Sequence, residues 1–406
     1  MYSKTLKEAQ PSVLAALTRS FQDLEKAEDL FQEASLRALQ TWPKQGLPDN
    51  PVSWLIRVGR NAGLDLGRKE ARLSILDSDV SDAGRAADEI AEDMDHQAFG
   101  DDMLRLLFIC CHPVLSKAQQ IALALKIVAG LSVSEIAGAF LVKVRTMEQR
   151  ITRAKKQIAS ESIPFDVPEE EERRRRIHAV STVIYLLFNE GYSASGGVAH
   201  IRATLCDEAI RLCRILTQIC PGHAESLGLL ALCLLQDSRR SARLDDSGDI
   251  VLLEEQDRSL WNVNRINEGT SVLQDALQLK QPGPYQIQAA IAAVHASAPS
   301  AKQTDYLEIC RLYEILEGIN PTPVVRLNRS IAISKVNGFA AALQLLETVG
   351  EELKDYFHFH GARAGLLAKL EKYGEAQVAF ERAMALARTP AERTHLKLQM
   401  EKFEKK

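Results

Sequence analysis

The 406-residue sequence lacks the long apolar runs that mark membrane segments. Its longest clearly apolar stretch, near Leu227 to Leu235, is far too short to span a bilayer. The first residues, MYSKTLKEAQPS, contain no apolar stretch like the core of a signal peptide. These absences predict a soluble, cytoplasmic protein.

The chain also lacks an excess of positive charge, since its formal net charge is -4. It is therefore not a general nucleic-acid binder, and any contact with DNA must come from local basic patches. Those patches lie mostly N-terminal to Ser160. With 46% apolar residues, the chain has enough material for well-packed cores in two to four domains.

The seven cysteines are an odd number in a long chain rich in helix formers, which argues against a disulfide framework. Cys206, Cys213 and Cys220 recur at a heptad spacing, but no His or Asp completes a tetrahedral ligand set with them. Cys110, Cys111 and His112 lack such a set too. We expect buried free thiols, no metal site and no cofactor.

The sequence pattern of residues 131–158 predicts two short helices joined by a tight corner. Ser132 can cap the first helix, and Glu135 completes a capping box. In the second helix, apolar residues recur at alternating spacings of four and three, which places them on one face. These residues are Met147, Ile151, Ala154 and Ile158.

The other faces of that second helix are polar and basic, with Arg145, Gln149, Thr152, Arg153 and Lys156. In a helix-turn-helix the second helix enters the major groove, where Arg and Gln read base edges and cations neutralise phosphates. An ordinary helical hairpin with a solvated charged face fits the same periodicity. The segment by itself leaves both interpretations open.

Nearer the N-terminus, helical spacing from Leu14 to Leu39 is interrupted by TWPKQGLPDNP and resumes as PVSWLIRVGRNAGLDLGRKEAR. Cations beside an aromatic ring suit unpaired nucleic acid, because bases stack on rings while cations follow phosphates. Alternatively, Trp54 fills a core and the cations are solvated. The polar and basic residues of this helix are Arg57, Arg60, Asn61, Arg68, Lys69 and Arg72.

Residues 77–102 contain ten acidic residues and one arginine, which predicts a flexible anionic linker. A second helical domain then runs from 103 to about 160. The order AEDLFQEASLRAL, NPVSWLIRVGRNAGLDLGRKEAR, acidic linker and helix-turn-helix resembles an extracytoplasmic-function sigma factor of the sigma-70 family.

The resemblance implies a sigma-2 domain over 1–76 and a sigma-4 domain over 103–160. It implies that Asp29, Gln32 and Glu33 bind core RNA polymerase, and that the helix with Trp54 recognises the minus-ten promoter element. It also implies that the minus-35 element is read by Arg145, Thr146, Gln149, Arg150, Arg153 and Lys156. Leu141 departs from the family pattern, which has glycine at the corner, so the turn there is expected to differ.

Residues 161–406 are not needed by a minimal sigma factor of this type. They begin near EEEERRRR, which predicts a self-neutralised helix. Further on, the cluster Asn189, Glu190, Gly191 and Tyr192 is predicted to break a helix at Gly191. It could be read as an acid–base pair, yet no nucleophile or metal ligand set accompanies it, so we expect a structural or partner-contact corner and no enzyme.

Helical repeats follow. Phe339, Ala342, Leu346 and Val349 recur as Tyr373, Ala376, Phe380 and Ala383, at an interval of about 34 residues that is the period of tetratricopeptide helix pairs. Two earlier segments share one internal spacing: Ala209, Cys213, Leu216 and Pro221, then Ile309, Tyr313, Leu316 and Pro321. Such units stack into a solenoid that binds a peptide or another domain.

One insertion, Arg239 to Asn262, interrupts the repeats and is expected to be an ordered excursion. The stretches FNEGYSAS, QDRSLWN and GPYQIQAAIAAVHA resemble the tetratricopeptide-like C-terminal extension of a subset of extracytoplasmic-function sigma factors. We therefore expect an all-α sigma factor that binds core polymerase and promoter DNA, with an extension that controls it in cis or docks a regulatory protein. The alternative is a DNA-binding adaptor that never engages polymerase.

Overall fold

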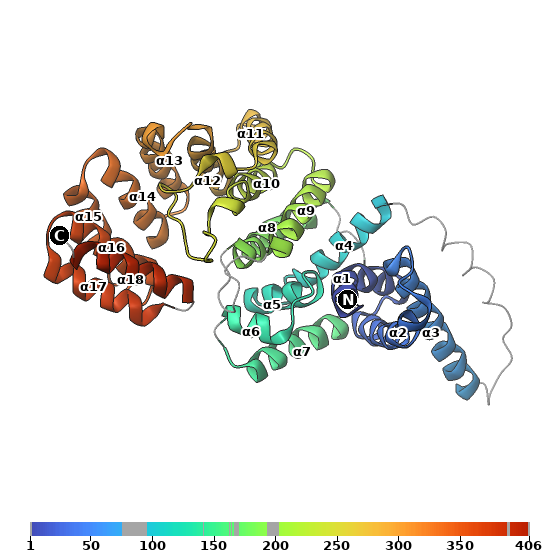
Figure 1. Cartoon of the computed structure of the whole chain (residues 1–406). Helices are drawn as coiled ribbons and strands as arrows, with labels where there is room; N and C mark the ends of the chain where they lie inside the picture. The colour runs from blue at the N-terminus through green and yellow to red at the C-terminus, as the bar shows by residue number, and fades with distance from the viewer. Residues whose placement is uncertain are drawn as a thin grey trace. The chain divides into compact units, whose positions relative to one another are not determined.

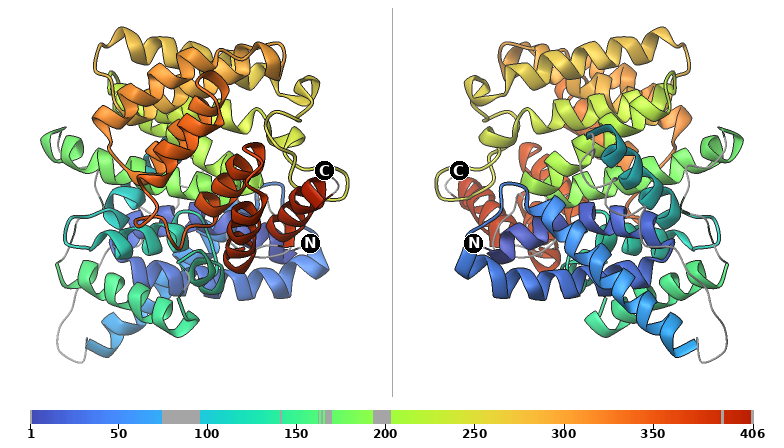
Figure 2. Two further views of the ribbon diagram at one scale, coloured as in Figure 1. Left: turned by 90° about the vertical axis from the view of Figure 1, so that its left-hand side faces the viewer. Right: turned by 90° about the vertical axis from the view of Figure 1, so that its right-hand side faces the viewer.

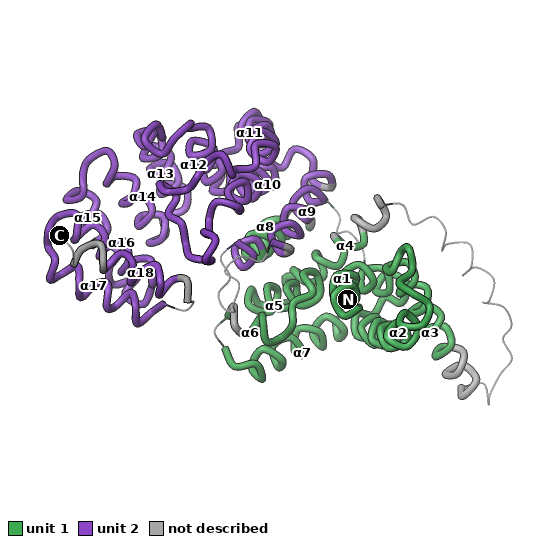
Figure 3. The backbone as a smooth tube through the Cα atoms, in the orientation of Figure 1, with its two compact units in different colours: residues 1–187 green, residues 188–406 purple. Residues whose placement is uncertain are grey.

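The computed structural model describes residues 2–74, 96–140, 142–161, 163, 165, 170–192, 203–387 and 390–404. Over these ranges the chain is helical and contains no strand, only an isolated antiparallel bridge between Leu244 and Ile250 (Figure 1). The predicted all-α fold is confirmed. The chain divides into two compact units, residues 1–187 and 188–406 (Figure 3).

The first unit opens with three long helices, α1 (Tyr2–Phe21), α2 (Leu24–Gln45) and α3 (Pro51–Ser74), each of which packs against the other two. The Asp23 side chain caps α2 by accepting from the backbone N–H of Lys26. Gly63 lets α3 approach α1 closely, since a Cβ there would lie 2.4 Å from the ring of Phe21. The turn between α2 and α3 is residues 46–50, so only the second half of the predicted interruption TWPKQGLPDNP is a turn; its first five residues, including Pro43, belong to α2.

Four shorter helices follow in the same unit: α4 (His96–Cys110), α5 (Lys117–Ile127), α6 (Val133–Phe140) and α7 (Val144–Ser160). The helix α4 packs on α1, and α5 and α6 both pack on α7. The last part of the predicted acidic linker is helical, because α4 begins at His96 and includes Asp102. The apolar run MLRLLFIC forms the rest of α4, and residues 75–95 lie outside the described ranges.

The helix α8 (Glu170–Tyr192) crosses the boundary between the two units, which falls after Leu187. The helix ends within the predicted cluster, at Tyr192, one residue after the predicted break at Gly191. Gly191 also permits close packing: a Cβ there would lie 2.8 Å from the backbone nitrogen of Cys206. The glycine serves a helix–helix contact within the second unit.

The second unit continues with α9 (Ala203–Ile219), α10 (Ala224–Asp237), α11 (Val263–Gln278) and α12 (Pro284–Ser297). The helix α10 packs against α9, α11 and α12, and the views from the side show these helices together (Figure 2). Between α10 and α11 lies the predicted ordered excursion. It contains two 3-10 turns, η2 (Arg240–Ala242) and η3 (Arg258–Leu260).

Six further helices complete the chain: α13 (Tyr306–Ile319), α14 (Pro323–Val336), α15 (Phe339–Glu347), α16 (Phe357–Lys369), α17 (Tyr373–Leu386) and α18 (Pro390–Glu404). The starts of α14 and α16 are separated by the same interval as the starts of α15 and α17. Equivalent positions on α15 and α17, Ala342 with Ala376 and Leu346 with Phe380, are all buried. The repeat seen in the sequence therefore corresponds to two tandem helix pairs.

Two absences concern the described residues alone. No helix among them is long and apolar enough to cross a membrane. No group of three or more His, Cys, Asp or Glu side chains among them is placed to hold a metal ion. Every cysteine is a free thiol, and all of them except Cys220 are buried.

The close approach at Gly191 gives a stability prediction. Replacing Gly191 with Ala inserts a methyl group against Leu205 and Cys206, so we expect the free energy of unfolding to fall by about 1–3 kcal/mol. Replacing Gly365 with Ala, inside α16 with no atom within 4 Å of the new Cβ, should raise it by about 0.5–1 kcal/mol. Urea unfolding followed by circular dichroism measures both, and equal effects from the two changes would contradict the packing role of Gly191.

Candidate nucleic-acid interface

The helix-turn-helix is built as its sequence predicts. Backbone nitrogens of Ser132 and Glu135 donate to each other's side chains, at 2.8 and 3.2 Å, which completes the capping box at the start of α6. Burial of Glu135 opposes its ionisation, but the hydrogen bonds from Ser132 and the charge of Lys7 hold the pKa of Glu135 below its usual value. The four apolar residues predicted to face inward on α7, from Met147 to Ile158, are all buried.

The residues predicted to read duplex DNA lie on the outside of α7. Arg145, Thr146, Gln149, Arg153 and Lys156 are exposed. Arg150 differs from them, since it is half-buried and its guanidinium lies over the Phe140 ring, 5.4 Å from the centroid. Arg150 thus packs α7 against α6, and the unusual corner residue Leu141 lies outside the described residues.

The helix α3 carries the residues predicted to contact the minus-ten element. Arg57 and Asn61 are exposed, whereas Trp54 is half-buried and meets the buried Trp42 edge-on with ring centroids 5.5 Å apart. Arg60 turns toward α1 and donates to the Ser20 hydroxyl at 3.0 Å. Burial and the nearby charge of Arg19 lower the pKa of Arg60.

The remaining three cations of that set, Arg68, Lys69 and Arg72, fall within the helical part of α3, and their side chains lie outside the described residues. The exposed part of α3 that the structure describes therefore offers Arg57 and Asn61 beside a half-buried indole. Such a surface can stack a base on one side of the ring and contact the backbone with the cation.

The residues predicted to bind polymerase lie in the middle of α2. Asp29 and Gln32 are exposed, and Glu33 is half-buried and accepts from Arg37 Nε at 2.8 Å within the same helix. A surface ion pair of this kind contributes little to stability. Two of the three predicted contact residues on α2 are thus exposed to solvent.

The sequence does not predict the ion pairs that join α7 to α2 and α6 to α1. Lys155 near the end of α7 forms an ion pair with Glu28 of α2, and both side chains are mostly buried, at 18% and 14% exposure. Lys7 of α1 also pairs with Glu135 at the start of α6, at 3.4 Å, in a more exposed position. No sequence signal identifies such pairs, because their members lie in different helices far apart along the chain.

A buried carboxylate links α4 to α1. Asp102 of α4 is 1% exposed and lies between two cations, Arg19 of α1 at 3.1 Å and Arg105 at 3.2 Å. Removing one partner from a buried charge is strongly destabilising, so this group ties α4 to α1. A residue expected in a flexible linker is in fact a buried acid that joins two helices.

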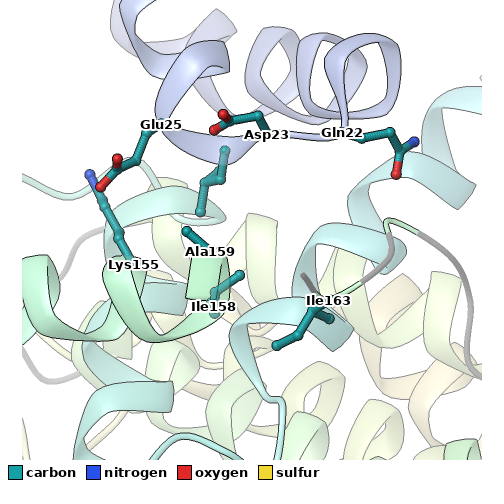
Figure 4. A pocket seen from close by; sticks show the side chains of 8 residues that line it. Gln22, Asp23, Glu25, Lys155, Ile158, Ala159 and Ile163 are labelled. Carbon is teal, nitrogen blue, oxygen red and sulfur yellow. The ribbon is translucent and has the colours of Figure 1, made fainter. Parts of the chain in front are cut away.

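A pocket of about 330 Å³ opens where the start of α2 meets the end of α7 (Figure 4). Its apolar wall is formed by Leu24, Ile158 and Ile163, and its polar rim includes Asp23 and Glu25. The backbone N–H of Phe165, a buried residue after α7, donates to the side-chain oxygen of Gln22 at 3.1 Å. The segment that leaves α7 is therefore anchored to the α1–α2 turn.

The corner 189–192 lies at the end of α8. Asn189 is half-buried, Glu190 and Gly191 are buried, and Tyr192 stacks on Phe188 with ring centroids 5.4 Å apart. Burial raises the pKa of the neighbouring Cys206 thiol to about 11, which favours its protonated form at neutral pH. Burial likewise raises the pKa of Cys111 in the first unit to about 12. These surroundings favour packing over catalysis.

Comparison with known protein families finds a separate match for each of two parts of the first unit. The family description "Sigma-70 region 2" matches residues 6–73, which lie in α1 to α3, and "Sigma-70, region 4" matches residues 105–158, which include the helix-turn-helix. Two separate parts of the chain are thus similar to regions of the sigma-70 family. Sigma-70 regions 2 and 4 imply core RNA polymerase and promoter DNA as partners, and members of this family are not enzymes.

Two further matches carry less informative descriptions. Residues 176–277 match a "Family of unknown function (DUF6596)". The chain is 50% identical over 398 residues to "Uncharacterized protein R00370" of Rhizobium meliloti (strain 1021), covering 98% of this chain and 94% of that protein. No solved structure matches the chain significantly.

The ion pair between α2 and α7 can be measured by a double-mutant cycle. Changing Glu28 and Lys155 to Ala, singly and together, should give a coupling energy of about 1–3 kcal/mol in urea unfolding, because both groups are largely desolvated. The exposed pair Lys4 and Glu8 within α1 is the control and should couple by less than about 0.5 kcal/mol. Coupling as weak in the first pair as in the second would refute the contact.

Proposed function

We propose that this protein is an RNA polymerase sigma factor of the extracytoplasmic-function type, with a tetratricopeptide-like extension that regulates it in cis. The observation that carries the proposal is the presence, in one chain and in this order, of matches to sigma-70 regions 2 and 4 followed by tandem helix pairs. In this role the protein brings core polymerase to a promoter and helps to open the duplex.

The exposed side chains of three helices support the roles that we propose for them. Asp29 and Gln32 on α2 are available to bind core polymerase, and Arg57 and Asn61 beside Trp54 on α3 to contact the unpaired minus-ten strand. The exposed face of α7 supplies major-groove and phosphate contacts at the minus-35 element. Arg150 contributes indirectly, because it packs α7 against α6.

Binding both promoter elements at once requires α7 to separate from α2. Elements named minus ten and minus 35 are about 25 base pairs apart, which is about 85 Å along a duplex at about 3.4 Å per pair. The 17 residues of α7 span about 26 Å, and the end of α7 contacts α2 through Lys155 and Glu28. The compact first unit is therefore a resting form, in which the two promoter readers are held too close together.

The extension is joined directly to the sigma domains. The helix α8 begins with residues of the first unit and ends in the second, so a continuous helix connects the two. The tandem pairs α14–α15 and α16–α17 repeat at about 34 residues, the tetratricopeptide period, and repeats of this kind bind peptides or other domains. We infer that a bound regulatory partner or a change within the extension favours the open form.

The sigma function is tested with reconstituted transcription. Core polymerase plus this protein should give promoter-specific transcripts, and Arg153→Ala should weaken binding to promoter duplex about tenfold or more, because an exposed arginine contact is lost. Lys117→Ala, which removes an exposed cation at the start of α5, is the matched control and should leave binding unchanged. DNA binding without any transcript under these conditions would favour the adaptor alternative.

Control by the extension is tested by truncation. A chain ending at Tyr192 keeps α8 complete and removes α9 to α18. We expect its promoter-specific transcription to differ from that of the full chain by severalfold, while its binding to core polymerase persists. Equal transcription from both chains, with no dependence on an added partner, would eliminate cis regulation and leave the sigma assignment intact.

A further inference from the structure

Three motifs that the sigma function does not explain meet in the second unit. Tyr192 of FNEGYSAS ends α8, Trp261 of QDRSLWN follows η3, and His295 of GPYQIQAAIAAVHA lies near the end of α12. Arginine side chains from the excursion between α10 and α11 contact all three. We call Arg239, Arg243, Arg258, Tyr192, Trp261 and His295 the arginine–aromatic cluster.

Two of the guanidiniums lie on Tyr192. The central carbon of the Arg243 guanidinium is 3.5 Å from the centroid of the Tyr192 ring, and that of Arg239 is 6.0 Å from it. Arg239 also donates to the Tyr192 hydroxyl at 2.7 Å, and Arg243 donates to the Tyr192 backbone carbonyl. Two positive charges therefore lie beside one aromatic ring.

Trp261 brings in the third guanidinium. Arg258 lies 4.7 Å and Arg239 lies 5.9 Å from the Trp261 ring centroid. Arg258 also donates to the backbone carbonyls of His295 and Ala298 at the end of α12. Arg239 is thus shared between the two rings, at the centre of the cluster.

The three arginines have no acidic partner among the described residues. In the part of the chain that the structure describes, no ion pair joins Arg239, Arg243 or Arg258 to a carboxylate, whereas Arg240 and Arg265 each pair with both Asp207 and Asp237. Burial and the charge of Arg239 lower the pKa of Arg243. Like charges are therefore crowded at one place, while nearby carboxylates neutralise other arginines.

Polar atoms without partners lie in the same place. Trp261 is 4% exposed, and its buried indole nitrogen has no hydrogen-bond acceptor among the described residues. His295 Nδ1 is also buried without a described partner. Burial, followed by the charges of Arg239 and Arg258, lowers the pKa of His295 to about 4, so its ring is neutral at pH 7 and can donate one hydrogen bond. A buried donor left unpaired is costly.

A purely structural role explains only part of this cluster. Arg243 and Arg258 bind backbone carbonyls at the ends of α8 and α12, where cations are favourable. That role does not account for Arg239, whose described hydrogen-bond partners are the Tyr192 hydroxyl and Gln236. It also leaves the crowded charge and the unpaired indole N–H unexplained.

We propose that the arginine–aromatic cluster binds a small oxyanion, a phosphate or a carboxylate, between Arg239, Arg243 and Arg258. Guanidiniums bind both groups through paired charge-assisted hydrogen bonds. Because Tyr192 is the last residue of α8, the ligand would act on the helix that begins in the sigma unit. This regulatory consequence rests on the proposed sigma function, whereas the binding itself does not.

The test uses the full-length protein without polymerase or DNA. Isothermal titration with inorganic phosphate and, separately, with succinate is carried out at constant ionic strength against sodium chloride. We expect saturable one-to-one binding of one of them, and the stronger ligand identifies the oxyanion as phosphate or carboxylate. Absence of saturable binding by both, or equal displacement by chloride, would overturn the proposal.

Two variants separate binding from folding. Arg239→Gln should weaken binding about tenfold or more, because it removes a charge-assisted contact. Without the anion, its melting temperature should stay the same or rise, since like-charge repulsion is relieved; a purely structural arginine would lower it. Arg214→Gln, which breaks the exposed pair with Glu268 in the same unit, is the matched control and should bind normally. Equal binding by wild type and Arg239→Gln would contradict the site.

Discussion

One stripe of four apolar side chains on α7 decides where every other side chain of that helix points. Met147, Ile151, Ala154 and Ile158 are buried where α7 packs on α5 and α6, and this fixes the rotation of the helix. Arg145, Gln149 and Arg153 are then left in solvent, where a duplex could meet them. The same rotation turns Lys155 toward Glu28 of α2, so one packing constraint sets both the face proposed to read DNA and the ion pair that joins α7 to α2.

Ion pairs join distant parts of the chain in both units, and the second unit also contains arginines without described carboxylate partners. In the first unit, cations and carboxylates from distant parts of the chain are paired, as in Lys155 with Glu28 and Asp102 between Arg19 and Arg105. Desolvated pairs of this kind hold helices in register, but they contribute less net stability than their Coulomb attraction suggests, because removing each charge from water is costly. In the second unit the excursion between α10 and α11 gathers arginines on Tyr192 and Trp261 without described carboxylate partners. The paired charges join helices, whereas the arginines on Tyr192 and Trp261 form the proposed oxyanion site.

Local sequence rules predict much of the fold and of the candidate site. The capping box of Ser132 and Glu135 and the inward face of α7 could be predicted, because both depend only on helical periodicity over a few residues. The repeat of Ala342 and Leu346 as Ala376 and Phe380 was visible for the same reason. The packing role of Gly191 could not be predicted, because a glycine near a helix end and one that allows a close helix contact look alike in sequence. The acidic composition before Asp102 predicts a linker, although the last residues of this run belong to α4.

By itself, the amino-acid sequence determined the helical class, the order of the sigma-70 regions and the position of the helix-turn-helix, since these follow from short-range periodicity and motif order. Only the tertiary structure decided that Lys155 meets Glu28, that Arg60 and Arg150 pack instead of facing solvent, and that Tyr192, Trp261 and His295 share a cluster with three arginines. Each of these depends on which residues, far apart in the chain or on neighbouring helices, are brought within a few ångströms of one another. Sequence spacing within a single helix carries no information about such distances.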